Sequence, residues 1–230
     1  MTATSDQYAP AALSGDKHRA LSIEGLALAR GGRTVAAGLT AQFSAHSTTI
    51  LRGANGAGKT TLLRTIAGFL SPTDGTITLY TNEDSEPSAA TEATRRRACV
   101  FFGHANGVKK ALSVEENLNF WCGLYGVRDR AAARASLDAV GLGPLAARRA
   151  ETLSAGQRRR LGLARVLVSG KSIWLLDEPT ASMDAASIDR FCTLVDQQRQ
   201  RGGCIIIATH DQLALEAQNL MLAPPNGGAS

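Results

Sequence analysis

A glycine-rich segment carries backbone and side-chain groups suited to holding phosphate. The residues GANGAGKT, at positions 53–60, match the pattern G-x-x-x-x-G-K-[ST] and lie between a predicted strand and a predicted helix. Glycines let backbone N–H groups turn toward phosphate oxygens, and a helix N-terminus adds positive potential there. The pattern therefore predicts a nucleotide-binding phosphate loop (P-loop), whose residues are Gly53, Ala54, Asn55, Gly56, Ala57, Gly58, Lys59, Thr60 and Thr61.

The polar residues at the end of this loop are expected to have separate roles. Lys59 can reach the β- and γ-phosphates as a mobile positive charge, and the Thr60 hydroxyl can ligate Mg²⁺. Thr61 either contacts the α-phosphate or caps the helix. The loop by itself indicates only that a nucleotide binds, because kinases, GTPases and motor ATPases share it.

Two carboxylates follow a short apolar run in the segment SIWLLDE. The run predicts a buried strand that delivers Asp177 and Glu178 at its carboxyl end, where ligands bind in open α/β sheets. We expect Asp177 to join the Mg²⁺ shell through water, and Glu178 to polarise the water that attacks the γ-phosphate. The alternative, that both residues only cap the turn at Pro179, is disfavoured by the presence of the P-loop.

A third motif, LSAGQ at positions 153–157, begins a predicted helix. Ser154 and Gln157 are spaced as a capping box. The Ser154 hydroxyl and the backbone N–H groups of Ala155 and Gly156 would together form an anion-binding surface. No phosphate site lies next to this surface in the sequence, so taken alone the motif could be a helix cap and nothing more.

Together, these motifs resemble those of the ATP-binding-cassette (ABC) ATPases. LSAGQ is similar to the family signature LSGGQ, with Ala155 in place of the first glycine. ASMD at 181–184 is similar to the D-loop SALD, and ATHD at 208–211 contains the switch histidine. The resemblance covers about residues 21–222.

This resemblance implies an ATPase that uses ATP and Mg²⁺. It also implies a head-to-tail homodimer, in which the signature surface of one copy covers the γ-phosphate held on the P-loop of the other. The catalytic residues that it implies are Glu178 and His210, and the metal-binding residues are Thr60 and Asp177. The nucleotide-binding residues that it adds to the P-loop are Ser154, Ala155, Gly156, Gln157 and Asp184.

Besides Ala155, the sequence departs from the family pattern in two respects. Most ABC ATPases have a glutamine between the P-loop and the signature that contacts Mg²⁺ or its water, and the matching position here is His104. A neutral imidazole can still accept a hydrogen bond from water, so we predict that His104 belongs to the site. The family also stacks adenine on an aromatic residue after the first strand, whereas this chain offers Arg30 or Arg33, whose guanidinium planes can stack instead.

The segments VFFGHANGVKKALSVEENLNFWCGLYG and ETLSAGQRRRLGLARVLVSGKSIWLLDEPTASMD resemble one ABC subfamily, the haem-exporter ATPases of cytochrome c maturation. This implies transmembrane permease partners of the haem-exporter type, and a peripheral position on the cytoplasmic face of the bacterial inner membrane. The alternatives are the ATPase of another exporter, for a drug, lipid or polysaccharide, and a soluble ABC ATPase acting on DNA or ribosomes. The latter carry tandem cassettes or coiled-coil insertions, which are not seen in this sequence.

Alternating strand and helix patterns must position these motifs. They predict an α/β fold with a mostly parallel core sheet, to which the resemblance adds an antiparallel β subdomain. LSIEGLALA, TAQFSAHSTTIL, GTITLY, ACVFF, SIWLLD and CIIIATH are the strand candidates, and TNEDSEPSAATEATRRR reads as a surface excursion. A run of helices without strands predicts an inserted helical lobe at about 104–170. We expect a disordered leader at 1–19, one ATPase domain at 20–223 and a disordered tail at 224–230.

The composition of the chain excludes several other classes of protein. No run of about eighteen apolar residues is present, and the start lacks the pattern of a secretory signal. The four scattered cysteines predict reduced core thiols. The net charge of +5 and the cluster Arg158–Arg160 could suit nucleic acid, but such clusters are typical of solvated helix faces, so we expect no nucleic-acid partner. In the helix that contains FWCGLYG, we expect Trp121 and Leu124 to lie in the core of the lobe.

Overall fold

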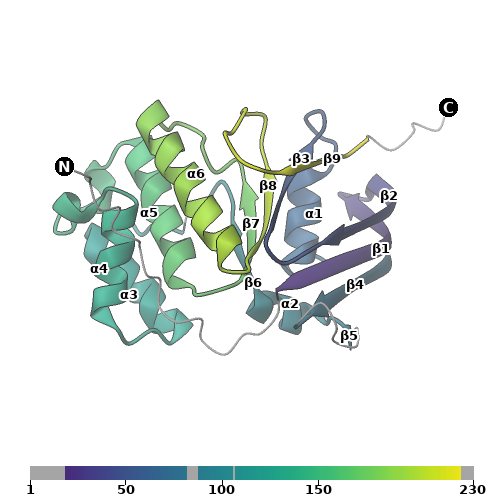
Figure 1. The fold of residues 1–230 in the computed structure, drawn as a ribbon, viewed down its shortest axis with the longest axis horizontal. Coiled ribbons are helices and arrows are strands. Elements are labelled where there is room, and N and C mark those ends of the chain that lie inside the picture. The colour runs from purple at the N-terminus through teal and green to yellow at the C-terminus, as the bar shows by residue number, and fades with distance from the viewer. Residues whose placement is uncertain (1–18, 82–87, 106, 224–230) are drawn as a thin grey trace.

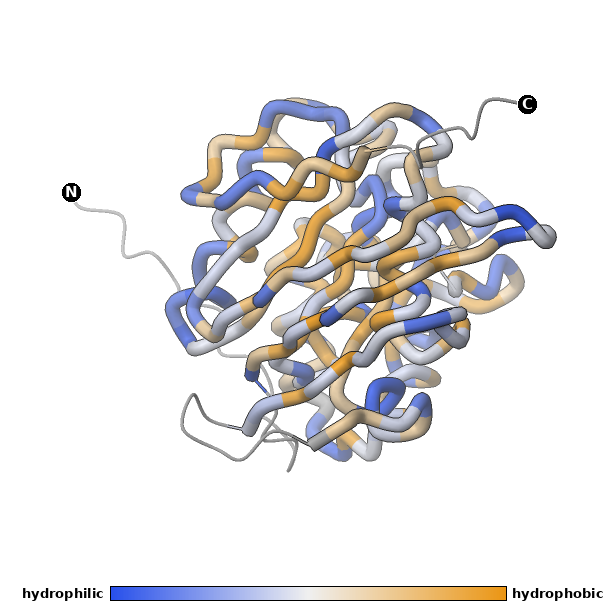
Figure 2. The backbone as a smooth tube through the Cα atoms, turned by 90° about the vertical axis from the view of Figure 1, so that its right-hand side faces the viewer, coloured by the Kyte–Doolittle hydropathy of each residue, from blue (hydrophilic) through white to orange (hydrophobic). Residues whose placement is uncertain are grey.

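A five-stranded parallel sheet forms the centre of the molecule (Figure 1). The computed structural model describes residues 19–81, 88–105 and 107–223. Figure 2 shows hydrophobic stretches of the backbone running through the interior of the molecule. Strands β7 and β8 are buried at every residue, as expected for a sheet that is covered on both faces. In spatial order the strands are β6 (Cys99–Phe102), β7 (Ile173–Asp177), β8 (Cys204–Ala208), β3 (Ser47–Arg52) and β9 (Gln218–Met221).

Alternate residues of the central strands face two different cores. Leu176 and Ile207 belong to the core that the sheet forms with the helical lobe. Leu175 and Ile206 belong to a second core, shared with helix α1 (Lys59–Ile66) and an antiparallel sheet. This alternation follows from the two-residue period of a strand, and it holds the P-loop helix between two sheets.

The antiparallel sheet has the strand order β2-β1-β4-β5 and lies beside α1 (Figure 1). The glycine pair at 31–32 makes the turn between the first two strands. This sheet places the loop after β1 close to the start of α1. Its strands are β1 (Ala20–Arg30), β2 (Arg33–Phe43), β4 (Asp74–Tyr80) and β5 (Ser88–Ala89).

The helices α3 to α5 pack on one another beside the β6 edge of the parallel sheet, and α6 packs on β8 and β3. Both predicted capping boxes are present: Ser113 with Glu116 begins α3, and Ser154 with Gln157 begins α5. The segment after β5 also contains a helix, α2. The helices are α2 (Glu92–Ala98), α3 (Val114–Tyr125), α4 (Arg130–Ala139), α5 (Ala155–Val168) and α6 (Ala185–Gln200), with short 3-10 turns η1 (Gly143–Leu145) and η2 (Ala150–Thr152).

The predicted fold class is confirmed, while several local predictions were wrong. TAQFSAHSTTIL is not one strand: β2 ends at Phe43 and β3 begins at Ser47, and His46 in the turn between them has a φ of 57°. Strand β9 and helix α2 were not predicted. Leu124 was expected in the core, yet it is 65% exposed, whereas Trp121 does pack against the core of the lobe.

All four cysteines are buried and reduced, as predicted. Burial raises the pKa of the Cys204 thiol to about 12, because the thiolate would have no solvent around it. Among the described residues, none of the helices has the length and apolar character needed to span a membrane. The tail, and all of the leader except Arg19, lie outside the described residues.

Candidate functional site

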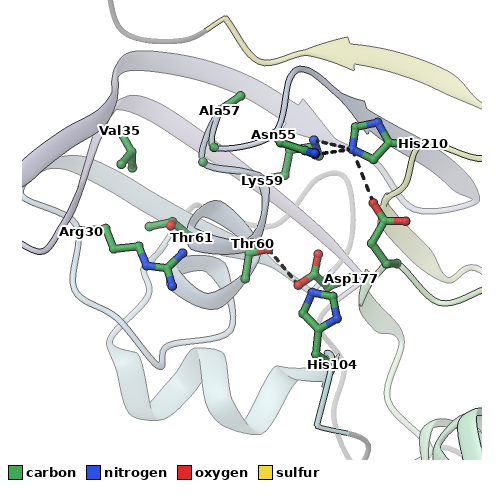
Figure 3. Close-up of a pocket in the computed structure, with 13 residues that line it drawn as sticks. Arg30, Val35, Asn55, Ala57, Lys59, Thr60, Thr61, His104, Asp177 and His210 are labelled. Atoms are coloured by element: carbon green, nitrogen blue, oxygen red, sulfur yellow. Dashed lines mark hydrogen bonds and ion pairs between the residues drawn. The ribbon is translucent and has the colours of Figure 1, made fainter. Parts of the chain in front are cut away.

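The carboxyl ends of four parallel strands bring the predicted motifs together. Strand β3 leads into the P-loop, β7 ends in the acidic turn, β8 leads to the histidine motif and β6 leads to His104. Such ends are the usual ligand sites of open α/β sheets. They surround a pocket of about 240 Å³ (Figure 3), lined by Arg30, Val35, Asn55, Gly56, Ala57, Gly58, Lys59, Thr60, Thr61, His104, Asp177, Glu178 and His210.

Three P-loop glycines have positive φ angles, but for different reasons. At Gly53 (φ 146°), a Cβ would come within 2.5 Å of the Leu222 carbonyl oxygen, so packing against the segment after β9 requires glycine. Gly58 (φ 92°) is the N-cap of α1, and a Cβ there would touch Val35. At Gly56 (φ 86°) a Cβ would meet nothing within 4 Å. The loop therefore needs glycine for its backbone conformation at all three positions, and for close packing at Gly53.

Lys59 is buried, and its ammonium group is hydrogen-bonded to the P-loop itself. The Nζ atom donates hydrogen bonds to the carbonyl oxygens of Gly53 at 2.6 Å and Ala54 at 3.2 Å. It also lies 3.3 Å from the His210 Nε2 atom. A phosphate oxygen would offer this ammonium group a charged acceptor in place of neutral carbonyls, and charged acceptors form the stronger hydrogen bonds. Gly53 and Ala54 do not line the pocket, but in this way they hold its lysine.

Thr60 and Asp177 form the part of the pocket suited to Mg²⁺. The Thr60 hydroxyl donates a hydrogen bond of 2.9 Å to the Asp177 Oδ2 atom, which joins α1 to the end of β7 (Figure 3). Both are hard oxygen donors, as Mg²⁺ prefers, and this ion usually combines one or two protein ligands with phosphate oxygens and water. No group of three or more His, Cys, Asp and Glu side chains capable of holding a metal occurs in the described part of the chain.

Glu178 is held in an unusual backbone conformation at the other end of the acidic turn. Its φ is 48°, and its N–H donates to the Ala208 carbonyl oxygen at 2.8 Å. Its Oε2 atom accepts a hydrogen bond of 3.2 Å from the Thr209 hydroxyl. Its Oε1 atom lies 3.8 Å from the His210 Nε2 atom. A non-glycine residue at positive φ persists only where its surroundings fix it. The surrounding contacts therefore hold both the backbone and the carboxylate of Glu178 in place.

Two histidines line the pocket from opposite neighbours of β7. His210 follows β8, and its Nε2 atom lies 3.0 Å from the Asn55 Oδ1 atom of the P-loop. With a proton on Nε2 the histidine donates to this oxygen, and without one the same atom accepts from the Lys59 ammonium group. His104 follows β6 and lines the same pocket as Asp177. Both histidines are exposed on the pocket side, where a bound phosphate or its metal could reach them.

The signature-like residues do not line this pocket. Ser154 and Gln157 exchange two hydrogen bonds, 2.9 Å from the Ser154 N–H to Gln157 Oε1 and 3.1 Å from the Gln157 N–H to Ser154 Oγ. Ala155 is exposed at the start of α5. A Cβ on Gly156 would come within 2.6 Å of the Ser182 carbonyl oxygen, so the signature helix packs directly on the D-loop.

Asp184 also lies outside the pocket, as the N-cap of α6. Its side chain accepts a hydrogen bond of 2.8 Å from the Ser187 N–H. Hydrogen bonds from Ser187 hold the pKa of this carboxyl below its usual value. Asp184 is therefore ionised at neutral pH and already occupied in capping the helix.

Two residues at or beside the pocket, Val35 and Arg159, were not assigned to the site by the sequence analysis. Of the two arginines proposed to stack on adenine, the structure favours one. Arg30 lines the pocket, whereas Arg33 does not. Val35 also lines it, from β2, a strand of which the sequence analysis recognised only the last part. Arg159 was assigned to a solvated helix face, yet it is buried beneath the acidic turn. No signal in the sequence separates Arg159 from Arg158 and Arg160 on either side of it.

Comparison with known proteins gives the same family as the motifs. The family model described as ABC transporter matches residues 36–181. The cytochrome c biogenesis ATP-binding export protein CcmA of Ruegeria pomeroyi is 46% identical over 204 residues, covering 89% of this chain and 91% of that protein. The CcmA protein of Cereibacter sphaeroides is 46% identical over 206 residues, covering 89% of each.

A solved structure agrees in fold. A putative ABC transporter ATP-binding protein from Pyrococcus furiosus superposes with a TM-score of 0.76 and 26% identity, covering 88% of this chain and 97% of that one. The similarity in sequence and in fold extends well beyond the phosphate loop that many nucleotide-binding families share. The chain therefore belongs to the ABC transporter family, as one of its ATP-binding, ATP-hydrolysing subunits.

Proposed function

We propose that the pocket holds the triphosphate of ATP against the P-loop, with Lys59 leaving its carbonyl partners to bind the β- and γ-phosphates. Asn55, the glycines and the backbone N–H groups at the start of α1 complete the cradle. Arg30 lines the pocket, and its guanidinium plane would stack on the adenine base. The observation that supports this most directly is that eleven predicted site residues, from four separate strand ends, line one pocket.

Mg²⁺ would be held by Thr60 and Asp177, with His104 reaching its water shell. When bound, the ion neutralises charge on the phosphate oxygens. The support for this assignment is the pair of hard oxygen donors, 2.9 Å apart at the pocket wall.

Glu178 is proposed as the residue that activates water. Its carboxylate accepts a proton from the water whose oxygen forms a bond to the γ-phosphorus, while the bond from that phosphorus to the bridging oxygen of ADP breaks. His210, 3.8 Å from this carboxylate and 3.3 Å from the Lys59 ammonium group, would donate a hydrogen bond to the γ-phosphate. These contacts give the histidine a position between the base and the P-loop.

We propose that the complete site needs a second copy of the chain. The exposed start of α5, with Ser154, Ala155, Gly156 and Gln157, offers an anion-binding surface that does not face its own pocket. In an isologous head-to-tail dimer each copy would cover the γ-phosphate of the other. Asp184 would lie at the same interface. The lobe at about 104–170 would carry the signature surface as a unit.

We further propose that the chain drives export for cytochrome c maturation, with haem as the transported group. This rests on the similarity of nearly the whole chain to proteins named for cytochrome c biogenesis export. The chain would act at the cytoplasmic face of the bacterial inner membrane, bound to permease subunits of the haem-exporter type. ATP binding would close the dimer and hydrolysis would open it, which moves the docked permease.

The cellular role can be tested in the organism that carries the chain. The chromosomal copy is replaced by Glu178→Gln and, in a matched strain, by Glu24→Gln, which changes an exposed carboxylate on β1. Covalent haem in c-type cytochromes is then measured on denaturing gels, with b-type cytochromes as an internal reference. Loss of c-type cytochromes in the first strain alone is expected. Normal c-type cytochromes in both strains would reject this role and leave another exporter.

A further inference from the structure

Arg159 is a buried cation directly beneath the acidic turn. It lies one turn after the start of α5, and it is only 5% exposed. Its guanidinium group stacks over the Phe102 ring, with the central carbon 4.3 Å from the ring centroid. Burial lowers its pKa to about 10, partly offset by Asp177 and Glu178, so the group stays protonated at neutral pH. A charge is thus maintained in the protein interior where few charged residues occur.

This guanidinium group donates hydrogen bonds to four backbone carbonyl oxygens around the site. Nη2 donates to Asp177 at 2.8 Å and also to Glu178, and Nε donates to Pro179 at 3.2 Å. Nη1 donates to Gly103, the residue before His104, at 3.0 Å. One planar group therefore ties the ends of β6 and β7 together.

The turn that these hydrogen bonds hold contains Glu178, the residue proposed to activate water. Glu178 has a φ of 48°, a conformation that a side chain with a Cβ disfavours. Such a conformation persists where several contacts determine it together. The planar fork of Arg159 supplies contacts to three consecutive carbonyls of this turn, which a flexible ammonium group cannot reproduce.

We propose that Arg159 is a positioning residue of ATP hydrolysis, which sets the place of the Glu178 carboxylate, and of His104, relative to the γ-phosphate. It does not line the pocket, and acts through the backbone of the acidic turn and of the β6 end. This inference rests on the proposed role of Glu178 as the base. The signature residues begin the same helix. Arg159 therefore also connects the turn that contains Glu178 to the helix whose start would contact the second copy.

The chain supplies a matched control in Arg165. This residue is on the same helix, is 9% exposed, stacks over Trp121 at 4.9 Å and donates to the Phe101 carbonyl oxygen at 2.7 Å. It shares with Arg159 the burial, the aromatic stacking and a bond to the end region of β6. Its hydrogen bonds go to the Phe101 carbonyl oxygen and the Tyr125 hydroxyl, and not to the acidic turn. Arg165→Lys therefore reports what the loss of a buried guanidinium fork costs in general.

The test compares Arg159→Lys with Arg165→Lys in the full chain, using steady-state hydrolysis of MgATP. Rates are normalised to the folded fraction measured by circular dichroism, so lost stability is not counted as lost catalysis. We expect Arg159→Lys to lower kcat about 10²-fold, the usual effect of misplacing a catalytic group by about 1 Å. The KM for ATP should change less than about threefold, because the P-loop is untouched. Arg165→Lys should change kcat less than about threefold.

A kcat for Arg159→Lys within about threefold of wild type, or an equal loss in both lysine variants, would overturn the inference. Glu178→Gln separates this outcome from a failure of the proposed function. If Glu178→Gln is slow while Arg159→Lys is normal, only the positioning role is rejected. If Glu178→Gln turns over normally, the base assignment fails and the role of Arg159 fails with it. Should Arg159→Lys not fold, Arg159→Gln, whose amide still donates two hydrogen bonds, is judged by the same limits.

Discussion

Replacing Glu178 by glutamine removes a proton acceptor while keeping the shape of the side chain. The amide has the same length as the carboxylate, and its oxygen can still accept the hydrogen bond from the Thr209 hydroxyl. The backbone bond from residue 178 to Ala208 and the positive φ are unaffected by the substitution. The change therefore tests proton transfer with little disturbance of the pocket.

The expected loss follows from what a positioned base contributes. General-base catalysis accounts for about 10² to 10⁴ in rate. At about 1.36 kcal/mol for each factor of ten, this is an increase in the activation free energy of about 2.7 to 5.4 kcal/mol. ATP affinity should stay nearly constant, because the Lys59 contacts and the Thr60–Asp177 pair do not involve this side chain.

Single-turnover hydrolysis of radiolabelled ATP, at saturating enzyme and Mg²⁺, measures the chemical step directly. Light scattering on the same samples follows dimer formation, which we expect to persist with ATP because the hydrolysis that would end it is blocked. Glu24→Gln, the exposed carboxylate on β1, serves as the control for a loss of negative charge. Wild-type turnover in Glu178→Gln would refute the assignment of the base, and a monomer at saturating ATP would refute the proposed dimer.

Three further changes test the P-loop, the signature helix and the core. Lys59→Ala should weaken ATP binding by about 2 kcal/mol, or about thirtyfold in Kd, in a calorimetric titration, and an unchanged Kd would contradict its phosphate role. Gly156→Ala should lower the free energy of unfolding in urea by about 1 to 3 kcal/mol, because its Cβ would meet a D-loop carbonyl. Ala155→Gly, at the exposed neighbouring position, should lower it by less than about 1 kcal/mol. Equal losses of stability in the two variants would reject the contact between Gly156 and the D-loop. Leu118→Ala, at a side chain 1% exposed, should cost about 2 to 5 kcal/mol in the same assay, and Leu124→Ala about 0.5 kcal/mol or less. A similar cost for the two leucines would contradict the burial described for α3.

The sequence predicted best those features that depend on short-range patterns. The capping boxes at Ser113 and Ser154 are read from two residues three positions apart, and both are present. The buried strand before Asp177 is read from an unbroken apolar run. In each case the residues that fix the structure are neighbours in the chain, so local propensity and tertiary packing agree.

Features that depend on distant partners could not be predicted. Strand β9 exists because it pairs with β3, and its own sequence has weak strand character. The exposure of Leu124 depends on how α3 is rotated against α5, which hydrophobicity alone does not set. Arg159 lies within a run of three arginines, and only the packing of α5 under the acidic turn distinguishes it from its neighbours.

The hydrogen bonds between Lys59 and the carbonyls of Gly53 and Ala54 bear on what happens between rounds of turnover. A buried ammonium group without an acceptor would be costly, and would favour collapse or solvation of the loop. Here the loop carbonyls serve as acceptors, so the Lys59 ammonium group has hydrogen-bond partners even without a phosphate. The same two carbonyls therefore hold the lysine in place and balance its charge within the loop.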